Sequence, residues 1–237
     1  MIQTEGIFVG GSAISAPIIG EDFNWSGGDG TYQVLDDGGG NWRIKFLSSG
    51  TFTPLKNMVI DVFLVGGGGG AGSSYCGEGG AGYTTTVRSV VLTANTAYPI
   101  VVGAAGTNGN PSSAGGETTA FTASAAGGKN TSNGTSSSKR PGGAGGSGGA
   151  GYVSPTTTTT GGTDGGDGTS SATTGGKGQG TTTREFGEAD GTLYASGGGS
   201  NLTATVSNSG NGGRNGITSI EPADGIVVIR QHKEVAA

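Results

Sequence analysis

The sequence predicts an all-β protein with an irregular glycine-rich body. Short runs of β-branched and aromatic residues gather towards the two ends of the chain, and 43 of the 55 glycines lie between residues 66 and 216. No segment sustains the 3.6-residue apolar period of an amphipathic helix. We therefore expect a β-strand framework, made of N-terminal strands and a C-terminal closing strand, that encloses a bundle of polyglycine-II helices.

Five segments have the residue pattern of strands. Residues 42–46 alternate apolar and basic side chains, which is typical of a half-buried strand. Residues 59–65 are β-branched and almost continuously apolar, which suits a central strand. The same chemistry, bounded by Gly, Asn, Asp or Pro, recurs at residues 87–92, 98–102 and 226–229.

The glycine-rich body must be ordered by something other than apolar burial. Residues 103–216 contain only six large apolar residues, which cannot offset the conformational entropy of so long a segment. The run from Gly142 to Gly151 repeats Gly-Gly-X, and a period of three is that of the polyproline-II helix. Glycine faces let such helices approach until their backbones form hydrogen bonds with one another. The alternative is a flexible Gly/Ser linker.

Composition excludes several classes of function. The net charge is −5 with 12 basic residues, which argues against nucleic-acid binding. Cys76 is the one cysteine, so neither an internal disulfide nor a cysteine-based zinc site is expected. No apolar run is long enough to span a membrane, and no signal peptide is visible, so we expect synthesis in a cytoplasm.

No cofactor, metal or catalytic site is expected from the sequence. Matches to G-x-G-x-x-G occur by chance in so glycine-rich a chain, and none opens a βαβ unit. A Ser-His-Asp arrangement would need His232, which stands beside Lys233 in what we expect to be an exposed tail. We therefore do not expect an enzyme.

An ordered set of motifs resembles the glycine-rich domain of phage tail fibres and related virion surface proteins. Residues 49–53 and 59–70 resemble its opening, and residues 80–83, 98–103, 119–128 and 197–199 follow in the family's order. Residues 225–230 resemble its closing strand, so the resemblance covers roughly residues 42–230. It implies a virion protein, commonly a tail fibre or a receptor-binding tip adhesin with variable loops on a polyglycine-II scaffold.

Recognition of a bacterial surface glycan or surface protein would then rest on loops and isolated aromatic residues. Loops on a rigid scaffold commonly carry specificity, and the candidates are residues 130–141, 154–160 and 180–190. Aromatic faces offer contact area for sugar rings at low entropic cost. The candidate receptor contacts are Tyr75, Tyr83, Phe121, Tyr152, Phe186 and Tyr194.

Residues 1–40 are expected to form an attachment or oligomerisation segment, and residues 41–237 the glycine-rich domain. The first segment is dense in large apolar residues and lies outside the resemblance. It would dock to another virion protein or form a homo-oligomer contact through Ile7, Phe8, Ile18, Phe23 and Trp25. The alternative function is a structural virion protein without a receptor, such as a head fibre or a capsid or tail decoration. An ice-binding protein is a third reading, but the regular Thr-X-Thr array of an ice-binding face is not evident.

Overall fold

The computed structural model describes residues 22–152, 159–169, 173–199, 201–214 and 219–232, and these residues form two five-stranded antiparallel sheets. The first sheet has the order β1 (Phe23–Trp25), β4 (Gly50–Pro54), β7 (Tyr98–Val101), β8 (Thr118–Ala120) and β9 (Ala123–Ala125). The second has the order β2 (Tyr32–Gly38), β3 (Asn41–Phe46), β10 (Ile226–Gln231), β5 (Met58–Val65) and β6 (Thr84–Leu92). The all-β fold class is thus confirmed.

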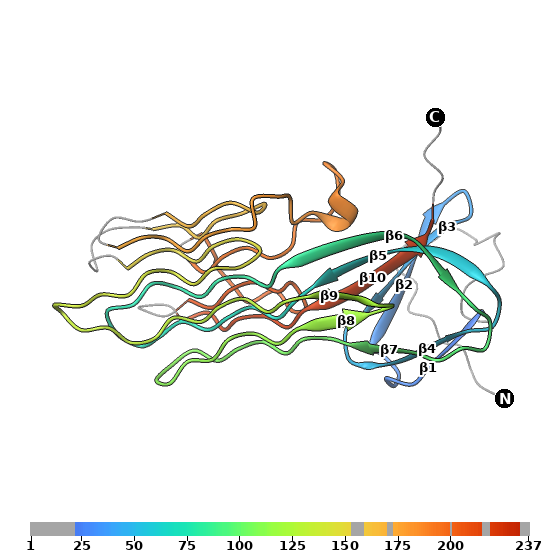
Figure 1. Ribbon diagram of the computed structural model, residues 1–237, viewed down its shortest axis with the longest axis horizontal. Helices are drawn as coiled ribbons and strands as arrows, with labels where there is room; N and C mark the ends of the chain where they lie inside the picture. The colour runs from blue at the N-terminus through green and yellow to red at the C-terminus, as the bar shows by residue number, and fades with distance from the viewer. Residues whose placement is uncertain (1–21, 153–158, 170–172, 200, 215–218, 233–237) are drawn as a thin grey trace.

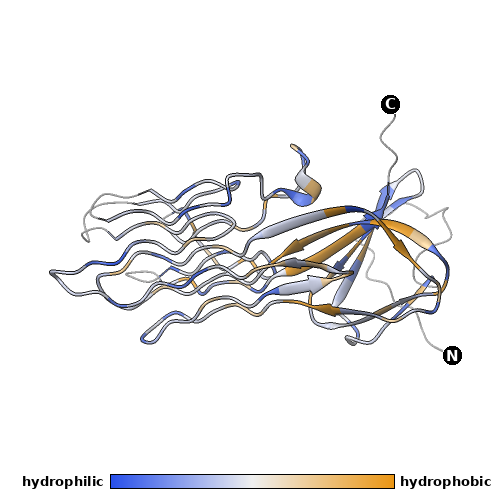
Figure 2. Ribbon diagram, viewed as in Figure 1, coloured by the Kyte–Doolittle hydropathy of each residue, from blue (hydrophilic) through white to orange (hydrophobic). Residues whose placement is uncertain are grey.

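The apolar core lies between the two sheets. Alternate residues of β3 and β5, such as Ile44, Phe46, Ile60 and Val62, point inward and are almost completely buried. Figure 2 shows the consequence, because apolar colour concentrates in the strands and fades in the rest of the molecule. The five strands predicted from the sequence are therefore present as β3, β5, β6, β7 and β10.

The boundary expected after residue 40 does not coincide with a break in the structure. Strand β1 pairs with β4 and strand β2 pairs with β3, so residues 23–38 belong to the two sheets. Phe23 packs into the core between the sheets and Trp25 lies against it. Residues 1–21, with Ile7, Phe8 and Ile18, lie outside the described residues.

The glycine-rich segments extend from one end of the sheets as a bundle of rods (Figure 1). Several rods continue a strand directly: β5 ends at Val65 and is followed by residues 66–71, and residues 77–83 lead into β6. The bundle therefore lies beside the strand framework at one end of it. The framework does not enclose it, contrary to the sequence-based expectation.

Residues 66–71 form the central rod, and successive residues donate hydrogen bonds to different neighbouring segments. The N–H groups of Gly67, Gly68 and Gly69 donate to the carbonyl oxygens of Gly116, Ala223 and Gly80, over 3.0, 2.9 and 2.8 Å. The pattern repeats after three residues, because Gly70 donates to Ser113 in the same segment as the partner of Gly67. A three-residue repeat is the period of polyglycine II.

The carbonyl groups of the same rod accept from three further segments. The oxygens of Gly67, Gly68 and Gly69 accept from the N–H groups of Gly128, Gly106 and Gly213, each over 2.8 Å. Residues 66–71 are all buried although Ala71 has their only side chain. The interior of the bundle is therefore built from backbone, with six neighbouring segments bonded to one rod.

Glycine is required in these rods because there is no room for a side chain. A Cβ atom on Gly67 would stand 2.0 Å from the carbonyl oxygen of Ala104, and one on Gly68 would stand 1.9 Å from that of Asn211. Alanine or serine occurs where the side chain has space. Packing thus explains the high glycine content without a flexible linker.

The Gly-Gly-X run from Gly142 to Gly151 is not one continuous rod. The chain bends at residues 145–147, and the N–H of Gly149 donates to the carbonyl oxygen of Gly143 over 2.8 Å. The run therefore makes two adjacent rods.

Among the described residues no helix is long and apolar enough to cross a membrane.

Candidate recognition site at the rod tip

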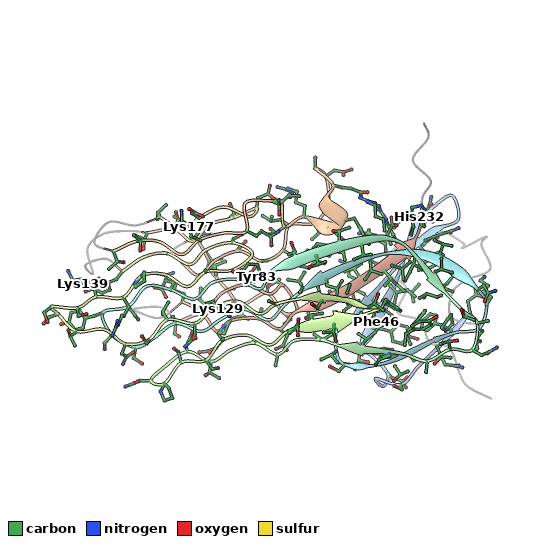
Figure 3. The ribbon with its side chains drawn as sticks, viewed as in Figure 1. Phe46, Tyr83, Lys129, Lys139, Lys177 and His232 are labelled. Carbon is green, nitrogen blue, oxygen red and sulfur yellow. The ribbon has the colours of Figure 1, made fainter. Side chains whose placement is uncertain are left out.

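The candidate site lies at the end of the rods that points away from the sheets. Figure 3 shows Lys139 at this end, whereas Phe46 and His232 lie at the strand end. Two stretches of chain meet near Lys139: residues 72–76, which link two rods, and residues 130–141, which were predicted as a loop. We call these two stretches, together with Tyr152, which contacts Tyr75 and Lys139, the rod tip.

Hydrogen bonds hold the two stretches of the rod tip together. The N–H of Gly134 donates to the carbonyl oxygen of Ser74 over 2.9 Å, and the N–H of Arg140 donates to that of Tyr75 over 3.0 Å. The N–H of Ser73 donates to Asn133 Oδ1 over 2.6 Å. None of these bonds uses a side chain of residues 135–139, which are exposed.

Tyr75, Tyr152 and Lys139 form an aromatic and cationic cluster at the rod tip. The ring centroids of Tyr75 and Tyr152 lie 5.8 Å apart with the planes tilted by 43°, and Lys139 Nζ lies 5.4 Å from the centroid of Tyr152. Tyr75 is 42% exposed and has a φ of 49°, an uncommon conformation for a residue with a side chain. The cluster joins residues that are far apart in sequence.

The rod tip offers the chemistry of a binding surface. Two neighbouring tyrosine rings provide amphipathic area, and a lysine over a ring adds a cation that hydroxyl or acidic groups can approach. Ser136, Ser137 and Ser138 supply exposed hydroxyl groups beside the cluster. Cys76 is half-buried next to it, and burial raises the pKa of its thiol, so it behaves as a packed residue.

Three of the predicted contact residues are buried, which corrects the expectation that they contact a receptor. Phe121 packs against Phe52 and Tyr98 in the core between the sheets. Phe186 and Tyr194 cover Phe63 on the outer face of the second sheet. Phe121 reaches the core from the two-residue turn between β8 and β9, whereas Phe186 and Tyr194 reach the second sheet from a long connection before β10.

The remaining candidates lie in different places. Tyr83 is half-buried at the junction between a rod and β6, away from the rod tip (Figure 3). The candidate recognition loop at residues 180–190 is only partly exposed. Its 3-10 turn, Glu185–Gly187, buries Glu185 and Phe186 on the second sheet, whereas residues 187, 189 and 190 are exposed. Of the expected loop 154–160, residues 154–158 lie outside the described residues.

The structure also brings together a charged cluster that the sequence did not reveal. Asp61 in β5 is completely buried, and it bonds to Arg88 at 3.1 Å, Arg230 at 3.2 Å and His232 at 2.6 Å. Burial alone would raise the pKa of Asp61, but hydrogen bonds from His232, the Ser89 N–H and Arg230 together hold it below its ordinary value. His232 therefore does not lie in an exposed tail, contrary to expectation. Only the pairing of strands joins these positions, so no local motif could have indicated the cluster.

Comparison with known protein families assigns the chain to one of them. A family model described as a glycine-rich domain matches residues 47–230. The chain belongs to this glycine-rich domain family. No curated protein matched the sequence.

The residues matched by the family model can be compared with the strands of the structure. It begins after β3 and ends within β10, so it includes the whole rod bundle and strands β4 to β10. Strand β10 nevertheless pairs with β3, which lies before the matched range. The glycine-rich domain is thus completed in this chain by residues that the family model does not cover.

Proposed function

We propose that this chain is a phage virion surface protein that binds a bacterial surface molecule with its rod tip. The observation that carries the proposal is the pair of neighbouring rings of Tyr75 and Tyr152 with Lys139 above one of them, presented at the far end of a hydrogen-bonded bundle. The family resemblance to tail fibres and tip adhesins supports the virion context. A tail fibre or fibre-tip adhesin is the form of protein that we propose.

The chemistry of the rod tip suits a hydroxyl-rich or acidic glycan. Sugar rings stack on aromatic faces, and the ammonium group of Lys139 and the guanidinium of Arg140 would attract acidic substituents. Several copies in one particle would raise the effective concentration of individually weak sites. An exposed loop of a surface protein is the other receptor with matching chemistry.

The opposite end of the molecule would face the virion. The strand framework lies away from the rod tip (Figure 3), and β1 begins there at Phe23. Because Phe23 and Trp25 pack in or against the core, attachment would depend on residues 1–21 with Ile7, Phe8 and Ile18. A variant that begins at Asp22 should fold but should not be incorporated into particles.

Binding by the rod tip is tested with purified protein on an array of bacterial surface glycans. Tyr152→Ala and Lys139→Ala should each weaken binding at least about tenfold, which corresponds to ~1.4 kcal/mol. Lys177→Ala is the matched control, because Lys177 is an exposed lysine on the rods that lies outside the rod tip. Its binding should equal that of the wild type.

The alternative is a structural virion protein, such as a head fibre or a capsid or tail decoration. It predicts that no rod-tip variant changes binding to any glycan or to bacterial cells. Labelling of the protein in intact particles separates the two functions. A position at a tail tip supports adhesion, whereas regular copies over the head or tube would replace the adhesin proposal with the structural one.

A further inference from the structure

We propose that Ser89, His232 and Asp61 form a hydrolytic site for carboxylic esters with a short acyl group. The three residues lie at the strand end of the molecule, far from the rod tip (Figure 3 labels His232). The proposal is independent of the adhesin function, and it departs from the sequence-based expectation of a protein without enzymatic activity. It rests on the order and geometry of their hydrogen bonds.

The three side chains are bonded in the order that a serine nucleophile requires. Ser89 Oγ lies 3.1 Å from His232 Nε2, and His232 Nδ1 lies 2.6 Å from Asp61 Oδ1. A carboxylate only accepts hydrogen bonds, so Nδ1 carries the proton and Nε2 of the neutral ring is left to accept from the Ser89 hydroxyl. This is the arrangement of nucleophile, general base and orienting carboxylate that recurs on unrelated folds.

The backbone at Ser89 is irregular in a way that exposes its hydroxyl. The β5–β6 register shifts between Ile60 and Val62, which indicates a bulge where Arg88 and Ser89 oppose Asp61. Ser89 has a φ of 58° and is exposed, although it lies within a nine-residue strand. Bulges redirect side chains, and strained conformations of non-glycine residues concentrate at functional sites.

Asp61 is placed to orient His232. Its Oδ1 faces His232 and the N–H of Ser89, and its Oδ2 faces Arg88 and Arg230, so separate oxygens serve the ring and the arginines. The carboxyl group is completely buried, whereas the His232 side chain is 22% exposed. The N–H of His232 also donates to the carbonyl oxygen of Val59 over 3.0 Å, which fixes its backbone.

A hollow of about 700 Å³ lies beside Ser89 and His232. Ser89 and His232 form part of its wall, together with Val59 and Val91, which are paired across β5 and β6. These valines are 40% and 70% exposed, so they offer apolar contact for a short acyl chain. The hollow is also lined by Asn57, Gln231 and Trp42, whose amide and indole N–H groups are uncharged hydrogen-bond donors.

The reaction that this geometry supports is acyl transfer to water. Ser89 Oγ attacks the ester carbonyl while His232 Nε2 takes the hydroxyl proton, and a bond forms between Oγ and the acyl carbon. The ester C–O bond then breaks, and His232 returns the proton to the departing alcohol. Water attacks the acyl-serine with His232 again as base, which releases the carboxylic acid and restores Ser89. Asp61 acts as a positioning residue through His232.

The test uses the full chain in two assays. In the first, a fluorophosphonate probe, which modifies activated serines, labels the protein. In the second, hydrolysis of p-nitrophenyl acetate is measured. Mass spectrometry should find the probe on Ser89, and the His232→Gln variant should react at least about 100-fold more slowly. Ser89→Ala and Ser89→Gly should abolish both labelling and ester hydrolysis above background. Glycine accepts the positive φ without strain, so the second variant separates loss of activity from loss of fold.

Ser124→Ala serves as the control, because Ser124 is also an exposed serine in a strand. It should label and hydrolyse like the wild type. Unchanged melting of each variant shows that it is folded. Absence of the probe from Ser89, or equally fast labelling of His232→Gln, overturns the proposal and leaves the three residues as a structural hydrogen-bonded cluster.

Discussion

Gly145 lies so close to Ala81 that a Cβ atom on Gly145 would stand 1.9 Å from the carbonyl oxygen of Ala81. Ala81 in turn donates its N–H to the carbonyl oxygen of Ser147 over 3.0 Å and is completely buried. The contact joins the bend at residues 145–147 to the rod of residues 77–83 through backbone atoms alone. This close approach therefore requires the absence of a side chain at position 145.

Gly145→Val should destabilise the protein by about 3 kcal/mol or more, because the rods must move apart and lose hydrogen bonds with neighbouring segments. Ala104→Val is the matched control, since Ala104 is exposed and its Cβ points out of the bundle. Its unfolding free energy should stay within about 0.5 kcal/mol of the wild type. Urea unfolding measures both. Equal stability of the two variants would show that the close approach is not required.

At the junction of a rod and the sheets, the side-chain hydroxyl of Thr118 makes hydrogen bonds that backbone groups make elsewhere in the bundle. Its completely buried hydroxyl donates to the carbonyl oxygen of Val65 over 2.6 Å and accepts from the N–H of Gly103 over 2.9 Å. Thr118→Val keeps the shape but leaves both backbone groups without this partner, and we expect a loss of about 2 kcal/mol or more. Thr119→Val, at a half-buried position, should change stability little. Thermal unfolding of both variants decides whether the hydroxyl matters.

Asp61 should make stability depend on pH in the acid range. Its pKa is lowered in the folded protein, so the unfolded chain binds its proton more readily and the stabilisation is lost as pH falls below about 4. The groups that face it are Arg88, Arg230 and His232. The difference in unfolding free energy between wild type and Asp61→Asn should therefore shrink from pH 6 to pH 3.

The loss of unfolding free energy in Asp61→Asn can be compared with that of a control variant at an exposed ion pair. At neutral pH the Asn variant should lose about 3 kcal/mol, because the buried Arg230 loses its bond to the Asp61 carboxylate and keeps only its ion pair with Glu188. Asp167→Asn removes an exposed ion pair with Lys177 and should leave the unfolding free energy almost unchanged, because solvent screens such a pair. A pH-independent difference for Asp61→Asn would show that ionisation of the Asp61 carboxyl group does not contribute to the stability.

The sequence predicted those parts of the fold in which local chemistry decides the structure. The β-branched run at 59–65 and the closing strand at 226–229 were found because burial on a sheet needs such residues. Strands β8 and β9 were not predicted, since their Thr, Ser and Ala residues carry no apolar pattern and form strands through partners already in place. The bend at residues 145–147 was missed because Gly-Gly-X continues through it unchanged.

The rod tip could be predicted only in part. Tyr75 and Tyr152 were recognised as isolated aromatic residues, but Phe121, Phe186 and Tyr194 looked the same in sequence and are buried. What separates the two groups is whether a connection ends over a sheet or beyond it. Where a connection ends depends on which rods lie next to each other. The three-residue glycine period predicts that a segment forms a rod, but it does not predict which other rod will pack against it.

Hydrogen exchange at Gly66–Gly70 tests most directly whether backbone hydrogen bonds order the bundle. These amides are buried, and each donates to a carbonyl oxygen of another segment over 2.8–3.0 Å. We expect them to exchange as slowly as the amides of β5, through global unfolding. The exposed amides of residues 136, 137 and 139 should exchange within the dead time of the experiment. Exchange of Gly66–Gly70 at the rate of an unstructured glycine peptide would contradict the account and restore the flexible linker.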